Sequence, residues 1–90
     1  PNGVCLSPDG KTLYVTEFSA GKIQSFRVNA DGSLGEKALF ADLKSLAQAR
    51  EIKGGGGADG IRCDKDGKVY STGPGGIWVL SPKGEFVAHL

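Results

Sequence analysis

The sequence lacks the features that mark membrane proteins and nucleic-acid-binding proteins. None of its apolar runs approaches the roughly 20 residues that a membrane-spanning helix needs. Its 11 basic and 10 acidic residues are scattered and give a net charge of +1, so the chain has neither a basic stripe nor an acidic tail. We therefore expect neither a membrane nor a nucleic acid as a partner.

Methionine is absent, and the chain opens on Pro1 with no recognisable signal peptide. For this reason we interpret the sequence as a piece of a longer one. Its 90 residues allow at most one small domain. We expect a soluble protein, cytoplasmic or periplasmic, and the sequence does not distinguish these compartments.

Glycine, in contrast, is abundant, with 15 residues, and it marks an internal repeat. The segment 1–11 (PNGVCLSPDGK) resembles the segment 58–68 (ADGIRCDKDGK), which lies 57 positions further on. The copies hold register from the pair Asn2 and Asp59 to the pair Lys11 and Lys68. Self-similarity of this kind predicts a repeat architecture.

Each copy continues with short β-branched and aromatic runs separated by glycine turns, which predicts four antiparallel strands per copy. The expected strands are Gly3–Ser7, Thr12–Thr16, Lys22–Val28 and Lys37–Ala41, and then Gly60–Cys63, Lys68–Thr72, Ile77–Leu80 and Glu85–Leu90. Between the copies, Leu43–Arg50 could form about two turns of helix or an extended arm, followed by the glycine run Gly54–Gly57.

Four-stranded units that repeat are typical of the blades of a β-propeller. The predicted fold class is all-β, with a first blade at residues 1–43, an inter-blade insertion at 44–57 and a second blade at 58–90. An eight-stranded β-sandwich is the main alternative, but it does not predict an in-register repeat.

Cysteine and histidine are scarce, with two residues and one residue respectively. Because Cys5 and Cys63 are one position out of step in the two copies, they should point to opposite faces of their strands. This disfavours a disulfide and favours two buried free thiols. The single histidine, His89, has no evident serine or aspartate partner, which argues against a catalytic triad.

The repeat heads and strand motifs also resemble a known family. The segments 2–3 (NG), 6–15 (LSPDGKTLYV), 59–62 (DGIR) and 75–79 (GGIWV) are similar to those of the senescence-marker-protein/gluconolactonase family. The resemblance implies two blades of a six-bladed propeller that holds one divalent metal ion, usually calcium, in its central channel. It also implies hydrolysis of sugar lactones or related esters.

The resemblance assigns metal-ligand roles to Asn2 and Asp59, and their chemistry agrees, because Ca²⁺ prefers hard oxygen donors such as amide and carboxylate groups. Zn²⁺, Mg²⁺ and Mn²⁺ are alternatives. The glycines that follow, Gly3 and Gly60, are expected to allow a close backbone approach or a positive φ. Asn-Gly and Asp-Gly are elsewhere turn dipeptides, but these two stand at repeat heads, before the first strand.

In the family, the carboxylate equivalent to Asp59 is also a candidate catalytic base, although a carboxylate bound to a cation is a poor base. Strand direction places the loops 17–21 and 73–76 at the same end as the heads. Glu17, Phe18 and Ser19 are therefore candidate substrate-rim residues. The family's other ligands, a glutamate and a further amide or acid, are missing from this sequence.

Three function classes stay open on the sequence: a metal-dependent lactonase, a non-catalytic binding propeller and a calcium-binding structural protein. The expected partners are a small lactone or ester and whatever covers the outer faces of the two blades. Those faces would be covered by the remaining blades of a longer chain or by copies of this chain in a trimeric ring.

Overall fold

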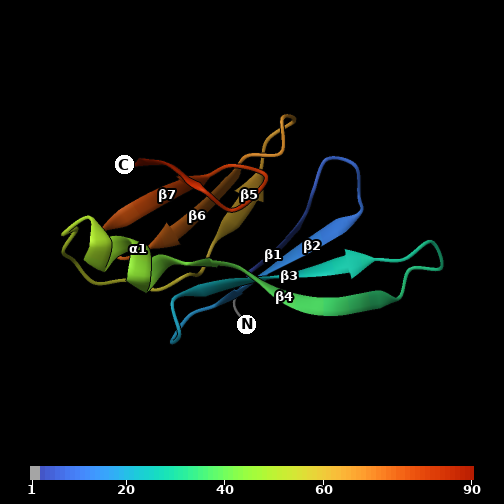
Figure 1. The fold of residues 1–90 in the computed structure, drawn as a ribbon, viewed down its shortest axis with the longest axis horizontal. Coiled ribbons are helices and arrows are strands. Elements are labelled where there is room, and N and C mark those ends of the chain that lie inside the picture. Colours follow the sequence, from blue (N-terminus) through green and yellow to red (C-terminus); the bar gives the residue numbers. More distant parts are fainter. Residues whose placement is uncertain (1–2) are drawn as a thin grey trace.

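The computed structural model describes residues 3–90, which form two four-stranded sheets and one short helix (Figure 1). The first sheet contains β1 (Val4–Leu6), β2 (Thr12–Glu17), β3 (Lys22–Val28) and β4 (Leu34–Asp42). The helix α1 (Leu43–Ala49) follows, and the second sheet contains β5 (Ile61–Cys63), β6 (Val69–Gly73), β7 (Gly76–Leu80) and β8 (Phe86–His89). The predicted all-β class and the eight strands in two groups of four are confirmed.

Both sheets are antiparallel meanders in which each strand pairs with the next along the chain. The alternation along β2 is typical of a strand with one covered face, because Tyr14 and Thr16 are buried and their neighbours less so. At the turns between the first two strands of each sheet, Gly10 has a φ of 72° and Gly67 one of 87°. Glycine adopts this left-handed conformation at little cost, so Asp9-Gly10 and Asp66-Gly67 are turn dipeptides, as predicted.

The offset in residue number between equivalent positions of the two copies is one residue shorter after the turns than predicted. In the first turn the N–H of Ser7 donates to the carbonyl of Thr12, whereas in the second the N–H of Asp64 donates to that of Lys68. Because the second turn has one residue fewer, Lys68 corresponds to Thr12 and not to Lys11. Beyond the turns the equivalent residues are therefore 56 positions apart, which pairs Thr16 with Thr72.

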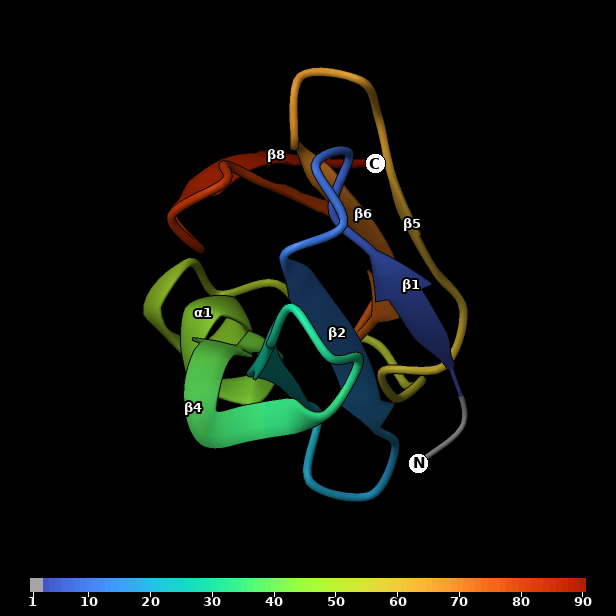
Figure 2. The same ribbon diagram turned by 90° about the vertical axis from the view of Figure 1, so that its right-hand side faces the viewer.

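The core lies between the two sheets, and α1 closes one side of it (Figures 1 and 2). Its buried apolar side chains come from both sheets, the helix and the linker: Tyr14, Ile23, Ala41, Leu43, Ala47, Ala58, Ile61, Val69, Trp78 and Leu80. Trp78 is fully buried and meets Phe86 edge to face at a centroid distance of 5.7 Å. Each sheet thus supplies the cover for one face of the other.

The segment after β4 is helical, which decides between the two alternatives left by the sequence. The carboxylate of Asp42 accepts a hydrogen bond of 3.1 Å from the N–H of Ser45 and caps the helix. Leu43 and Ala47, one turn apart, are both buried against the sheets. In the part of the chain that the structure describes, no helix has the length and apolar character to cross a membrane.

The two cysteines lie on opposite faces of their sheets, as predicted, yet they meet. Cys5 lies on the face of β1 opposite the exposed Val4 and Leu6, and Cys63 lies on the face of β5 opposite the exposed Arg62. Adjacent sheets pack by unlike faces, so opposite orientations bring the two side chains together. Their Sγ atoms are 3.4 Å apart, and both remain free thiols, as the sequence favours, although they are half-buried rather than buried.

Candidate functional site at the repeat heads

The heads of the two repeats lie at the same end of the molecule, where β1 and β5 begin side by side (Figure 2). The carbonyl of Gly3 accepts a hydrogen bond of 2.9 Å from the N–H of Thr16 at the end of β2. The carbonyl of Gly60 accepts an equivalent bond of 3.0 Å from the N–H of Thr72 on β6. The strand direction thus gathers both heads and the loops after β2 and β6 at one end.

Thr16 joins the two heads through its side chain. Its hydroxyl accepts a hydrogen bond of 2.8 Å from the N–H of Gly3 and donates one of 2.9 Å to the carbonyl of Asp59. The side chain has no solvent exposure. A buried hydroxyl with both kinds of partner is satisfied, so it links the sheets without an unpaired polar group.

Thr72 holds the second head from its own sheet. Its hydroxyl accepts hydrogen bonds of 3.0 Å and 3.2 Å from the N–H groups of Asp59 and Gly60. The same hydroxyl donates to the carbonyl of Gly57 at 3.3 Å. The backbone of Asp59 is therefore fixed at its N–H by one blade and at its carbonyl by the other.

The carboxylate of Asp59 is the free part of this residue. Asp59 is exposed, and its side chain makes no hydrogen bond or ion pair within residues 3–90. By contrast, Asp9 in the first turn accepts hydrogen bonds from the Ser7 hydroxyl and the Lys11 N–H, and these lower its pKa. Asp59 is thus a hard oxygen donor on a fixed backbone, which suits a ligand of a divalent cation.

The other sequence-predicted ligand, Asn2, lies outside the described residues. Within residues 3–90 no group of three or more histidine, cysteine, aspartate or glutamate side chains could hold a metal ion. Asp59 therefore fits a divalent cation as one member of a larger donor set.

The two head glycines differ in what they permit. A Cβ added to Gly3 would collide with the carbonyl oxygen of Asp59, so this glycine allows the close approach that the sequence predicted. Around Gly60 there is open space, and its φ is not positive. The prediction for Gly60 is wrong because β5 begins on the outer side of the contact, where nothing presses on it.

The candidate rim residues lie at the head end, as strand direction requires, but they differ in availability. The Glu17 carboxylate accepts a hydrogen bond of 2.5 Å from Gln24 Nε2, and this bond lowers its pKa. Phe18 is 46% exposed, and its carbonyl lies against Gly57. Ser19 is exposed, and its carbonyl accepts a bond of 2.6 Å from Lys44 Nζ. Phe18 is thus the rim side chain with the most free surface.

The glycine run of the linker also lies at this end. Gly55 accepts a hydrogen bond of 3.0 Å from the N–H of Gly75. Cβ atoms on Gly54 and Gly57 would meet Gly75 and Phe18 respectively. The run therefore passes between the loops after β2 and β6, where side chains at Gly54 and Gly57 would not fit.

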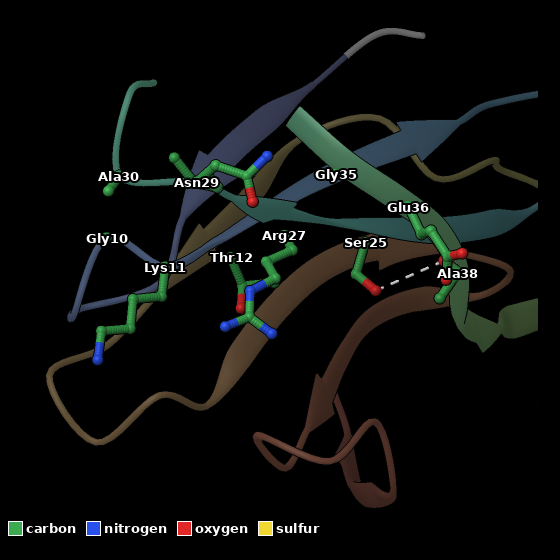
Figure 3. Close-up of a pocket in the computed structure, with 11 residues that line it drawn as sticks. Gly10, Lys11, Thr12, Ser25, Arg27, Asn29, Ala30, Gly35, Glu36 and Ala38 are labelled. Carbon is green, nitrogen blue, oxygen red and sulfur yellow. Dashed lines mark hydrogen bonds between the residues drawn. The ribbon is translucent and has the colours of Figure 1, made fainter. Parts of the chain in front are cut away.

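A hollow lies at the opposite end of the first sheet, away from the candidate ligand. A hollow of about 1060 Å³ lies along the first sheet beside Lys11, Thr12, Ser25 and Arg27, next to the Asp9-Gly10 turn (Figure 3). In Figure 3 the charged ends of the Lys11 and Arg27 side chains are separate from one another. This hollow lies at the other end of the strands from Asp59, so it is separate from the repeat-head site.

The sequence reasoning missed the two threonines. Tyr14-Val15-Thr16 and Tyr70-Ser71-Thr72 are similar tripeptides that end the second strand of each copy. Their equivalence is hard to see in the sequence because they lie 56 positions apart, whereas the repeat heads lie 57 positions apart. A one-residue gap after the turn glycine would have aligned them.

Two meander sheets that pack by unlike faces, with their first strands adjacent, define two neighbouring blades of a β-propeller. Over residues 1–90 the sequence matches the family described as "SMP-30/Gluconolactonase/LRE-like region". The chain belongs to this family.

Characterised members resemble it in sequence and in fold. A gluconolactonase of Zymomonas mobilis subsp. mobilis is 30% identical over 87 residues, which cover 94% of this chain and 24% of that protein. A gluconolactonase from Xanthomonas campestris has a TM-score of 0.80 at 30% identity, covering 100% of this chain and 27% of that one. A calcium-binding regucalcin from Agrobacterium tumefaciens strain C58 has a TM-score of 0.72 at 28% identity, covering 97% of this chain and 28% of that one.

The chain is short beside its relatives. It spans 29% and 24% of the length of two curated relatives that it matches.

Proposed function

We propose that this chain is part of a hydrolase of sugar lactones that uses one divalent cation, Ca²⁺ in the first instance, and that Asp59 is one of the cation's ligands. The observation that carries the proposal is the exposed carboxylate of Asp59, which has no partner within residues 3–90, on a backbone held by Thr16 and Thr72. The gluconolactonases among its relatives support the substrate class, and the calcium-binding regucalcin supports the ion.

Asp59 fits such an ion as one of the several oxygen donors that the ion needs. Ca²⁺ takes six to eight oxygen ligands, so a single carboxylate needs further donors. Asn2 precedes Gly3, whose backbone is held against Asp59 by Thr16, and we propose its amide oxygen as the second ligand. The remaining ligands would come from other blades.

Lactone hydrolysis adds water to the ring carbonyl carbon and breaks the bond from that carbon to the ring oxygen, which leaves a hydroxy acid. A bound divalent cation would supply Lewis-acid polarisation of the carbonyl. Asp59 would hold the cation, and its fixed backbone would keep the carboxylate in place. Because a carboxylate bound to a cation is a weaker base, we propose a part in proton transfer only as a second role of Asp59. Phe18 would contact the substrate at the rim.

The test compares the wild-type complete protein with Asp59→Ala. Gluconolactone hydrolysis is followed by proton release, with the uncatalysed rate subtracted, before and after treatment with a chelator. We expect chelation to abolish turnover, added Ca²⁺ to restore it, and Asp59→Ala to lower kcat/KM at least about 100-fold. Calorimetry should show Ca²⁺ binding weakened at least about tenfold in the same variant.

Asp66→Ala is the matched control, because Asp66 is also an exposed aspartate followed by glycine but lies at the opposite end. We expect its activity and Ca²⁺ affinity to stay within about twofold of the wild type. Ca²⁺ binding without turnover would favour a calcium-binding structural protein. Turnover that survives both chelation and Asp59→Ala would refute the cation-dependent mechanism.

A further inference from the structure

The contact between the two blades contains a pair of thiols that the candidate site does not use. Cys5 on β1 and Cys63 on β5 have their Sγ atoms 3.4 Å apart, and both side chains are half-buried. Cys5 lies two residues after Gly3, and Cys63 lies four residues after Asp59. The contact between the two thiols therefore lies between β1 and β5, the strands that follow the two repeat heads.

The distance is short enough for a bond to form with little rearrangement. A disulfide has an S–S length near 2.05 Å, so the sulfur atoms must approach by roughly 1.4 Å. Each cysteine has a single side-chain torsion that can supply this movement, and the two face one another across unlike sheet faces. The same packing that brings them together keeps them apart from other thiols of a second molecule.

Burial keeps both groups protonated at neutral pH. It raises the pKa of Cys63 to about 12 and also raises that of Cys5, with the Arg62 guanidinium acting weakly in the opposite direction on Cys5. Asp64 further raises the pKa of Cys63, and the two cysteines in turn raise the pKa of the neighbouring phenol of Tyr14, which burial raises most. The thiolate fraction is therefore small at neutral pH, so the pair suits slow oxidation rather than catalysis and persists as two thiols until an oxidant reaches it.

We propose that Cys5 and Cys63 are a redox-responsive modification site, which a small-molecule disulfide such as oxidised glutathione converts into a disulfide between adjacent blades. Cys5 first loses its proton to the solvent, and its thiolate then attacks the small disulfide, forms a mixed disulfide and expels one small thiolate, which takes up a proton. Cys63 then loses its proton and attacks the Cys5 sulfur, which expels the second small thiolate. The protein loses two electrons and two protons, and the oxidant is reduced to two thiols.

Closing this bond would enclose the whole first blade and the linker in one covalent loop. The loop runs from Cys5 to Cys63, so it includes β2, β3, β4 and α1. Cross-links over long loops restrict the unfolded chain most, and the oxidised form should resist heat better than the reduced form. The oxidation state of the pair would thereby set how firmly the two repeat heads are held together.

The experiment incubates the folded protein with oxidised glutathione at a pH of about 8.5, traps free thiols by alkylation and measures intact mass and non-reduced peptide maps. We expect a mass loss of about 2 Da relative to the reduced protein, with no retained glutathione, and one peptide pair linking Cys5 to Cys63. The midpoint of thermal unfolding should rise by roughly 10 °C in the 90-residue chain, and a reductant should reverse both changes.

Two variants separate this outcome from non-specific oxidation. In Cys63→Ser, the remaining Cys5 should retain one glutathione and gain no thermal stability. In the double variant Arg62→Cys with Cys63→Ala, the thiol moves to the opposite face of β5, where the side chain is exposed, and no internal cross-link should form. Retention of two glutathiones by the wild type, a disulfide between two molecules, or an unchanged mass would each overturn the proposal.

Discussion

The hydroxyl of Thr16 is the residue-scale feature on which the head geometry depends. It bonds the N–H of Gly3 and the carbonyl of Asp59, which belong to different blades. It therefore positions the backbone of the proposed cation ligand Asp59. Such a residue would affect both stability and the site.

Replacing Thr16 by Val should destabilise the fold, because the shape is kept while the part-buried N–H of Gly3 and the part-buried carbonyl of Asp59 lose their partner. We expect a loss of about 1–3 kcal/mol in the free energy of unfolding, measured by denaturant titration. Thr16→Ser, which keeps the hydroxyl, should recover most of it. Thr12→Val on the same strand is the control and should cost less than about 0.5 kcal/mol. Equal losses in the two valine variants would contradict the assigned role.

Single residues were predictable where their identity was informative alone. Asp59 stood out because an Asp-Gly pair at a repeat head differs from one inside a turn, and the turns at Asp9 and Asp66 behave as expected. Thr16 did not stand out, because threonine is common in strands and its partner 43 residues away is set by blade packing. The contact of Cys5 with Cys63 was missed for the same reason. The face of the strand on which a side chain lies follows from the local sequence, whereas the residue packed against that face depends on how the blades are arranged.

At the scale of elements, the two repeat heads are similar in sequence but unequal in packing. The start of β1 lies against the backbone of Asp59, whereas the start of β5 faces open space at Gly60. The inequality arises because each head presses on the next blade along the chain, and the structure contains a next blade for the first head alone.

This difference predicts opposite effects of the same substitution. Gly3→Ala should destabilise the fold by about 2 kcal/mol or more, because its Cβ would strike the carbonyl of Asp59 and force the blades apart. Gly60→Ala should be neutral or stabilising by up to about 1 kcal/mol, since it restricts the unfolded chain without a clash. Thermal or denaturant unfolding of the two variants side by side measures the difference. A loss at Gly60 as large as that at Gly3 would count against the packing described.

Element positions followed from the sequence because strand periodicity and turn glycines are local signals. The strand Lys22–Val28 has the predicted bounds, and β4 starts earlier than the predicted Lys37, at Leu34, because its pairing with β3 continues through a bulge. The helix α1 was left open because seven residues carry little periodic signal, and burial of Leu43 and Ala47 decides it.

For the whole molecule, equivalent positions in the two blades reveal which surface is uncovered. Tyr14 is 4% exposed because the second blade covers it, whereas its equivalent Tyr70 is 37% exposed. Ile77 and Val87 are also exposed on the second sheet, and Val4 and Leu6 on the first. We propose that either further blades of a longer chain or further copies of this chain, as in a trimeric ring, cover these surfaces.

The 90-residue chain studied alone should therefore associate in solution. We expect light scattering to give a mass about three times 9.3 kDa, and Ile77→Lys, which charges the uncovered face, to lower the mass toward that of one chain. Ala30→Lys adds the same charge in an exposed turn and should leave the mass unchanged. A single chain that unfolds cooperatively as a monomer would contradict the need for cover.

The bond from Thr16 to Asp59 runs forward along the polypeptide, from an earlier blade to the head of a later one. During synthesis the support for each head is consequently made before the head itself emerges. A propeller built this way would set its ligands one after another in the order of translation. The side chain that ends the second strand of a blade would then be a determinant of the following blade's ligand, and an exchange of single blades between relatives would have to carry that threonine with it.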